Sequence, residues 1–333
     1  MSVRVGVFGA TGYAGQELVS LLRRHPQGSV AFTTGSGARH LAHEKGLDEA
    51  ADVYMLALPH GVAASYASKL RASRPGALVV DLSGDLRLPT AAAYQKWYGH
   101  EHAAPELIGK AVFGLSEHYR AELRGARLVS NPGCYATSVL LPLVPLLREG
   151  LVRTAGIVAD AKSGATGAGR SLREDLLFCE VAENFSAYSP GRSHRHVGEI
   201  ESVLQDRTGQ SVELTFCPHL LPVKRGILTA LYVEPTRELA SLRRALEAAY
   251  AGSPFVRVVD SPPRLGDVVQ TNDCRISLHA AATGRAVLFC ALDNLVKGAA
   301  GQAIQNMNLA LGFAEADGLP SAFEAAAPLG ARA

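Results

Sequence analysis

A glycine-rich turn near the start of the sequence constrains the fold of this chain more than any other feature. Residues 3–8 form an apolar run typical of a buried strand, and residues 12–24 place apolar side chains on one face of a helix. Glycines at positions 9, 12 and 15 lie between them. This spacing permits a tight turn, close approach of a pyrophosphate and packing of the helix on the strand. The pattern predicts a dinucleotide-binding loop; the alternative is a merely structural turn.

The first half of the chain alternates short apolar strands with helices, as parallel α/β sheets do. Residues 30–34, 52–58, 78–82 and 127–130 have the pattern of further strands. Ligands of an open α/β sheet lie beyond the carboxyl ends of its strands. The candidate cofactor contacts from this rule and from the glycine-rich turn are Gly9, Thr11, Gly12, Tyr13, Ala14, Gly15, Pro59 and Ser83.

The pattern changes near residue 134. A helix is expected over residues 136–149, and one clear helix, residues 238–250, lies among the strands that follow. These strands are expected over residues 156–161, 212–217, 227–233, 274–280 and 286–293. The last helix, residues 297–311, begins with small residues, which would let it return to the first domain.

The length of 333 residues predicts about two domains. We expect an α/β protein in which residues 1–133 with 300–333 form a Rossmann-type parallel-sheet domain. Residues 134–299 would form an α+β domain.

Composition and charge exclude several classes of protein. Apolar residues make up 47% and charged residues 19%, as in globular proteins. The net charge of +2 has no basic run, which argues against nucleic-acid and membrane-surface binding. No signal peptide is expected, and the longest apolar stretch, residues 139–147, is too short to span a bilayer. Five cysteines without a CxxC pair indicate a reduced, cytoplasmic protein.

The end of the second expected strand indicates which nicotinamide cofactor binds. NAD-binding proteins commonly place a carboxylate there to hold the ribose 2′-hydroxyl. This segment instead carries Thr34, Ser36 and Arg39, with no acidic residue between them. Hydroxyl groups and an arginine suit a 2′-phosphate, so we predict NADP; the alternative is that Arg39 is a solvated loop residue.

Cys134 is the strongest candidate for a catalytic residue. It follows Asn131-Pro132-Gly133 and opens a helix, where the helix dipole should lower the thiol pKa and favour a nucleophilic thiolate. The alternative is a packing role. The other cysteines lie in apolar or strand-like settings and are expected to be buried: Cys179, Cys217, Cys274 and Cys290.

A thiol nucleophile needs an acid/base partner, and His194 and His196 are the best candidates. They lie in a polar stretch expected to precede a helix. Their spacing also allows a metal pair or a plain surface cluster. A third ligand at a usual spacing is missing, so we predict no metal.

A second glycine-rich loop spans residues 162–170. It is not a phosphate loop of the Walker type, because its lysine precedes the glycines. Ser163 and Gly164 could hold phosphate, substrate or the nicotinamide ribose, and Arg225 could bind an anionic group. The alternative for both is a flexible loop with a solvated basic residue.

These segments together resemble the N-acetyl-gamma-glutamyl-phosphate reductases of arginine biosynthesis, relatives of aspartate-semialdehyde dehydrogenase. The resemblance covers nearly the whole chain, and its most specific motifs are GATGYAG (9–15), LALPHG (56–61), DLSGDLRL (81–88), SNPGCY (130–135), KSGATGAGR (162–170), SHRHVGEIE (193–201) and DNLVKGAAGQAIQNMN (293–308). One departure is that the chain reaches Asp52 soon after Arg39, which shortens the adenosine-side segment.

The resemblance implies roles for individual residues. Cys134 would be the nucleophile and His196 the acid/base, with residues 134–299 as the catalytic and dimerisation domain. Asn294 would join the cofactor contacts. The implied substrate-binding residues are Arg87, Asn131, His194 and Arg225. A homodimer or homotetramer is expected.

The implied reaction reduces a small acyl phosphate to an aldehyde with NADPH, through a cysteine thioester. Alternatives are a reductase of carrier-protein-linked aminoadipyl phosphate in lysine biosynthesis and a non-catalytic NADP-sensing protein. An acidic carrier would favour a basic rim, which the sequence lacks, so the free N-acetylglutamyl substrate is favoured. A short-chain-type dehydrogenase is excluded, because Tyr66 and Lys69 have the wrong spacing for its catalytic pair.

Overall fold

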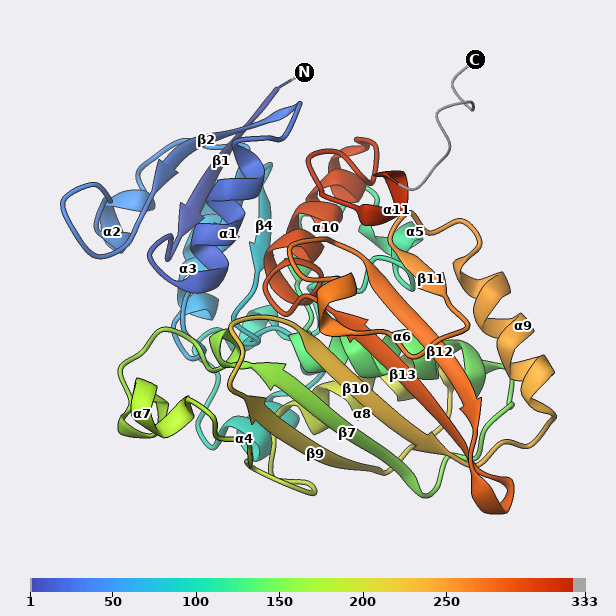
Figure 1. The fold of residues 1–333 in the computed structure, drawn as a ribbon. Helices are drawn as coiled ribbons and strands as arrows, with labels where there is room; N and C mark the ends of the chain where they lie inside the picture. Colours follow the sequence, from blue (N-terminus) through green and yellow to red (C-terminus); the bar gives the residue numbers. More distant parts are fainter. Residues whose placement is uncertain (1, 326–333) are drawn as a thin grey trace.

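Two β-sheets organise the protein, as the computed structural model of residues 2–325 shows (Figure 1). The first sheet has six strands in the order β2-β1-β3-β4-β6-β5, and all its pairings are parallel. Its strands are β1 (Val3–Phe8), β2 (Gly28–Thr33), β3 (Val53–Leu56), β4 (Leu78–Asp81), β5 (Val112–Phe113) and β6 (Leu128–Ser130). This confirms the predicted Rossmann-type sheet.

The second sheet has seven strands in the order β11-β12-β13-β10-β7-β9-β8 and is mixed, because β10 runs antiparallel to both β13 and β7 while β7 and β9 are parallel. Its strands are β7 (Ile157–Gly164), β8 (Ser186–Ala187), β9 (Leu214–Leu221), β10 (Ile227–Val233), β11 (Val256–Val258), β12 (Cys274–Ala280) and β13 (Ala286–Leu292). The predicted combination of a parallel sheet with a mixed α+β part is confirmed.

Helices connect and cover these sheets. They are α1 (Tyr13–Leu22), α2 (His43–Gly46), α3 (Ala63–Ser73), α4 (Ala91–Tyr98), α5 (Arg120–Leu123), α6 (Cys134–Arg148), α7 (Phe178–Val181), α8 (His196–Thr208), α9 (Leu239–Tyr250), α10 (Gly301–Leu311) and α11 (Ala322–Ala325). A π-helical turn, η6 (Val296–Ala300), leads into α10. Short 3-10 helices are η1 (Pro105–Leu107), η2 (Ala165–Ala168), η3 (Glu174–Leu176), η4 (Leu265–Asp267) and η5 (Ala282–Gly284).

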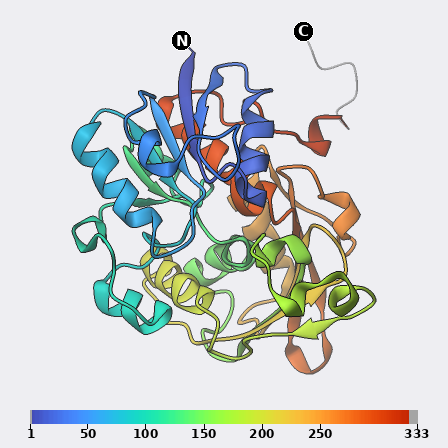
Figure 2. The same cartoon turned by 90° about the vertical axis from the view of Figure 1, so that its left-hand side faces the viewer.

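The long helix α6 lies at the centre of the core. Its apolar segment, residues 139–147, is entirely buried, which explains the longest apolar run of the sequence. The helix contacts α8, α9, β10 and β13. Figure 2 shows α6 (green) and α8 (yellow) below the strands of the first sheet. Within the described residues, no helix is long and apolar enough to cross a membrane.

The last helix approaches the first sheet, since α10 contacts α1, α5 and β4. The domain boundaries at residues 134 and 300 stay predictions, and residues 326–333 of the predicted first domain lie outside the described part of the chain.

One expectation about the cysteines is wrong. Cys274 and Cys290 are buried as expected and Cys217 is partly buried, but Cys179 is exposed because it belongs to the short peripheral helix α7.

Candidate active site

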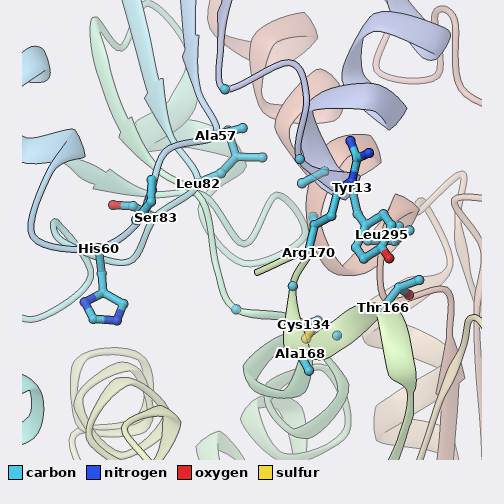
Figure 3. A pocket seen from close by; sticks show the side chains of 18 of the residues that line it. Tyr13, Ala57, His60, Leu82, Ser83, Cys134, Thr166, Ala168, Arg170 and Leu295 are labelled. Atoms are coloured by element: carbon cyan, nitrogen blue, oxygen red, sulfur yellow. The ribbon is translucent and has the colours of Figure 1, made fainter. Parts of the chain in front are cut away.

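A cavity of about 950 Å³ lies where the carboxyl ends of β1, β3, β4 and β6 face the loop after β7 and the turn η6. Figure 3 shows Cys134 below Arg170, with His60 on the opposite side of the cavity. Fifteen residues predicted from the sequence line this cavity: Gly9, Thr11, Gly12, Tyr13, Ala14, Gly15, Ser36, Pro59, Ser83, Arg87, Asn131, Cys134, His194, His196 and Asn294. The five that do not line it are Thr34, Arg39, Ser163, Gly164 and Arg225.

The glycine-rich turn has the geometry of a phosphate cradle. Gly9 has a φ of +77°, and a Cβ atom there would lie 2.2 Å from the carbonyl oxygen of Ala57. A Cβ atom on Gly15 would lie 2.2 Å from the carbonyl oxygen of Gly9. The N-cap of α1, Gly12, has no side chain to occupy the helix start, so the first N–H groups of α1 face the cavity. These residues fit the pyrophosphate of a dinucleotide.

The end of β2 and the turn after it lie at one side of the cavity. Ser36 lines it, whereas Thr34 is buried and its hydroxyl accepts a hydrogen bond from the N–H of Gly9 at 3.3 Å. The same hydroxyl lies 2.6 Å from Nδ1 of His43, which lines the cavity and was not predicted from the sequence. Arg39 is exposed in the turn beyond. The chain then reaches β3 through the four-residue helix α2.

The second glycine-rich segment contributes its later residues to the cavity. Ser163 and Gly164 still belong to β7, so their backbones pair within the sheet rather than forming a loop. Thr166 lines the cavity, and its hydroxyl accepts a hydrogen bond from the Nδ2 amide of Asn294 at 2.9 Å. Arg170 lines it too and donates a hydrogen bond to the carbonyl oxygen of Thr11. This segment therefore meets the dinucleotide loop across the cavity.

Cys134 is the first residue of α6 and lines the cavity beside η6. A Cβ atom on Gly298 would lie only 2.7 Å from Cβ of Cys134, so this close approach needs a glycine. Burial raises the pKa of the Cys134 thiol to about 11, although the charge of Arg87 and the N–H of Tyr135 oppose the shift. The expected lowering of this pKa by the helix start is therefore wrong, because loss of hydration outweighs it.

The raised pKa predicts how fast Cys134 reacts with an alkylating reagent. The thiolate is the reactive form, and its fraction increases with pH until the pH reaches the pKa. We expect the rate of alkylation of Cys134 by iodoacetamide to rise about tenfold for each pH unit between about pH 7 and pH 10. Peptide mass spectrometry would separate Cys134 from the exposed Cys179. A rate that levels off below about pH 8 would show a preformed thiolate and contradict this account.

His196 packs directly against Gly133, the residue that precedes Cys134. A Cβ atom on Gly133 would lie 2.5 Å from Nε2 of His196. Burial, followed by the charges of His194 and Arg87, lowers the pKa of His196 well below its usual value. The ring is therefore neutral near pH 7 and can accept a proton. Among the described residues its Nδ1 atom has no hydrogen-bond partner.

His194 supports this arrangement from the preceding turn. Its Nδ1 atom accepts a hydrogen bond from the backbone N–H of His196 at 3.1 Å, and the two ring centroids are 4.7 Å apart. Burial lowers the pKa of His194 to about 4, with a smaller contribution from the charge of Arg195. Of the two histidines, His196 lies against Gly133 while His194 orients the chain that carries it.

A buried ion pair joins the loop after β4 to α8 close to Cys134. The Nη1 group of Arg87 lies 3.2 Å from Oε2 of Glu199, and the two side chains are only 7% and 3% exposed. Glu199 also accepts a hydrogen bond from the N–H of Gly133 at 2.7 Å, and its Oε2 is 4.0 Å from Nε2 of His196. Glu199 was not predicted from the sequence; only its place one helical turn after His196 could have indicated it.

Asn131 and Arg225 have different environments. Asn131 lines the cavity, its carbonyl oxygen accepts from Nε of Arg87 at 2.8 Å, and its amide donates to the carbonyl oxygen of Ala299 at 3.1 Å. Arg225 instead pairs with Glu17 at 3.0 Å and with Asp293 at 2.9 Å, outside the cavity lining. These carboxylates already neutralise the guanidinium of Arg225.

Residues 2–325 contain no group of three His, Cys, Asp or Glu side chains placed to hold a metal.

Solved structures with this fold include aspartate-semialdehyde dehydrogenases. Aspartate semialdehyde dehydrogenase II of Vibrio cholerae, complexed with ASA, superposes with a TM-score of 0.70 at 16% identity, over 93% of this chain and 98% of that one. The enzyme of Candida albicans with NADP has a TM-score of 0.60 at 16% identity, over 93% and 98% of the two chains. At these identities the likeness establishes the fold.

Sequence comparison establishes the family. The semialdehyde dehydrogenase NAD binding domain matches residues 4–126, which places a nicotinamide cofactor site in the first part of the chain, and the semialdehyde dehydrogenase dimerisation domain matches residues 134–294. The N-acetyl-gamma-glutamyl-phosphate reductase of Rhodospirillum rubrum is 46% identical over 95% of this chain and 97% of its own. That of Symbiobacterium thermophilum is 44% identical over 97% and 99%. The chain belongs to the N-acetyl-gamma-glutamyl-phosphate reductase family of oxidoreductases.

Proposed function

We propose that this protein reduces N-acetyl-L-glutamyl 5-phosphate to N-acetyl-L-glutamate 5-semialdehyde with NADPH, a step of arginine biosynthesis. The observation that carries the proposal is the shared cavity: the dinucleotide cradle at Gly9–Gly15 and the thiol of Cys134 line the same space, and His196 is packed beside them. This arrangement fits acyl transfer to a thiol followed by reduction in place.

The proposed acylation step starts from neutral partners. Since burial keeps the Cys134 thiol protonated and His196 unprotonated, the imidazole takes the thiol proton as sulfur attacks the acyl carbon. The carbon–oxygen bond to phosphate breaks, the departing phosphate takes up that proton, and a thioester remains on Cys134. Gly133 cannot assist the oxyanion with its N–H, which Glu199 already occupies, so the donors left at the helix start are the N–H groups of the first turn of α6, beginning with Cys134.

Release of the product uses the same two side chains. NADPH, when bound, supplies the hydride for the thioester carbonyl. Gly12 to Gly15, Ser36, Pro59, Ser83 and Asn294 are the cavity-lining residues proposed to hold it. Cys134 then leaves the resulting thiohemiacetal as its carbonyl re-forms, and His196 returns a proton from solvent to the sulfur.

The reverse reaction tests the proposed function. With N-acetylglutamate 5-semialdehyde, inorganic phosphate and NADP+, we expect phosphate-dependent formation of NADPH, measured by its absorbance. NAD+ should be the poorer substrate. No rate with this aldehyde, together with turnover of carrier-linked aminoadipate semialdehyde, would assign the protein to lysine biosynthesis instead. A protein that binds NADP+ but turns over neither aldehyde would be a sensor.

NADP rather than NAD is proposed because the turn after β2 carries no carboxylate between Thr34 and Arg39, and Ser36 and His43 line the cavity beside it. We expect Arg39→Asp to raise the Kd of NADPH much more than that of NADH, since a charge-assisted phosphate contact is worth about 1.5–3 kcal/mol. Equilibrium fluorescence titration measures both constants. Arg39→Lys is the charge-preserving control.

An equal effect of Arg39→Asp on the two cofactors would place the 2′-phosphate elsewhere. The neighbouring cavity residue, His43, is the alternative contact, and His43→Ala would then show the selective loss.

We also propose a cytoplasmic homodimer or homotetramer. The five cysteines are free thiols, as expected in a reducing compartment. The second half of the chain matches a domain described as a dimerisation domain.

A further inference from the structure

Three arginines line the cavity, and their partners differ. Arg87 is buried and paired with Glu199. Arg170 donates to the carbonyl oxygen of Thr11 in the dinucleotide loop. Arg195 is exposed and forms no ion pair with any carboxylate in residues 2–325. Of these three guanidinium groups, only that of Arg195 both lies away from the dinucleotide loop and has no carboxylate partner among residues 2–325.

The surroundings of Arg195 hold its guanidinium at the wall opposite the dinucleotide loop. The group lies over the ring of Tyr98, 5.7 Å from its centroid, and the ring of His60 is 5.5 Å from the same tyrosine. Figure 3 shows His60 across the cavity from Tyr13 and Arg170. His194 and His196 flank Arg195 in the chain and also line the cavity, and the charge of Arg195 contributes to the lowered pKa of both.

The charges of Arg87 and Arg195 both lower the pKa of His196, but of the two it is Arg87 that acts on Cys134. Arg87 is the cation that opposes the rise of the Cys134 pKa, so its charge is felt at the reacting sulfur. Arg195 lowers the pKa of His60, after the effect of burial, and of His194. Phosphate leaves from the carbon that Cys134 attacks, which places the departing anion nearer to Arg87. Arg195 can therefore bind an anionic group of the substrate that lies farther from the sulfur of Cys134.

We infer that Arg195 binds the α-carboxylate of the acylamino-acid substrate and so determines which acyl phosphates are accepted. The inference rests on the proposed function, because two methylene groups and the α-carbon separate this carboxylate from the reacting carbonyl. A guanidinium presents parallel N–H donors that match a carboxylate, and that of Arg195 lies over the Tyr98 ring at the cavity wall.

Steady-state kinetics in the reverse direction separates the anions, because aldehyde, phosphate and NADP+ each have their own KM. We expect Arg195→Ala to raise the KM for N-acetylglutamate semialdehyde by about 10- to 150-fold, the equivalent of losing a charge-assisted contact. The KM values for phosphate and NADP+ should stay unchanged. Arg195→Lys, which keeps the charge without the fork, should recover part of the loss.

The α-carboxamide of the same aldehyde separates a carboxylate-binding role of Arg195 from a merely structural one. The wild-type enzyme should discriminate against the amide by a similar factor, and Arg195→Ala should treat acid and amide alike. Arg192→Ala is the matched control, since Arg192 belongs to the same segment, pairs with Glu201 at 2.6 Å and does not line the cavity.

Two outcomes would overturn the inference without touching the proposed function. A rise in the KM for phosphate instead of the aldehyde would make Arg195 a phosphate-binding residue. Unchanged discrimination between acid and amide in Arg195→Ala would place the carboxylate elsewhere. By contrast, a wild-type enzyme that is inactive with the semialdehyde would refute the proposed function itself.

Discussion

Replacing Cys134 with alanine is expected to abolish turnover while leaving NADPH binding intact. Cys134 and the glycine-rich turn line the same cavity but come from different elements, the start of α6 and the loop between β1 and α1. Loss of the sulfur removes the thioester, for which no other side chain can substitute. We expect the rate to fall by about ten-thousand-fold or more. NADPH fluorescence would show an unchanged Kd.

Two further variants make this result specific. Cys134→Ser should also be nearly inactive, because an alcohol is a poor nucleophile at neutral pH. Cys179→Ser is the matched control: its thiol is exposed on α7, outside the cavity lining, and activity should be retained. If Cys134→Ala kept activity within about tenfold of the wild type, covalent catalysis would have to be abandoned.

The parts of the site that could be predicted from the sequence follow local rules. Three glycines between a strand and a helix set the dinucleotide turn, and Pro59 and Ser83 follow strands whose carboxyl ends meet at one edge of a parallel sheet. These rules need only the period of apolar residues and the handedness of the chain. They place cavity residues correctly without knowledge of any side-chain contact.

The parts that could not be predicted depend on contacts between distant segments. Glu199 reaches Gly133 across 66 positions, so nothing near Cys134 indicates it. The thiol pKa is set by burial among elements that only the folded chain brings together. Ser163 was expected in a loop, but β7 continues through it, because pairing with β10 extends the strand to that point.

Arg225 illustrates the same limit. A basic residue beside a glycine has the sequence pattern of a free anion clamp, yet the fold brings Glu17 and Asp293 to it from 208 and 68 positions away. Arg195, flanked by two histidines, has a less distinctive sequence pattern, yet it lines the cavity and forms no ion pair with a carboxylate among the residues that the structure describes. Charge partners thus decide which arginines can meet a ligand.

The ion pair between Arg87 and Glu199 should make a large contribution to stability that depends on both partners. We expect Glu199→Ala to lower the free energy of unfolding by about 3–5 kcal/mol, because it leaves the Arg87 guanidinium buried without a counter-charge. It also leaves the N–H of Gly133 without its acceptor. Calorimetry at pH 7 would record a lower unfolding temperature.

Removal of both charges separates stability from catalysis. The double variant Arg87→Met with Glu199→Leu buries no unpaired charge, so it should regain much of the lost stability. It should nevertheless remain inactive, since Arg87 is the cation beside Cys134 and Glu199 holds the backbone of Gly133. Glu234→Ala is the control, because its pair with Arg153 is more than half exposed, at 51% and 63%, and should contribute less than about 1 kcal/mol. Equal destabilisation by the single and double variants would show that packing, rather than charge, makes this contact important.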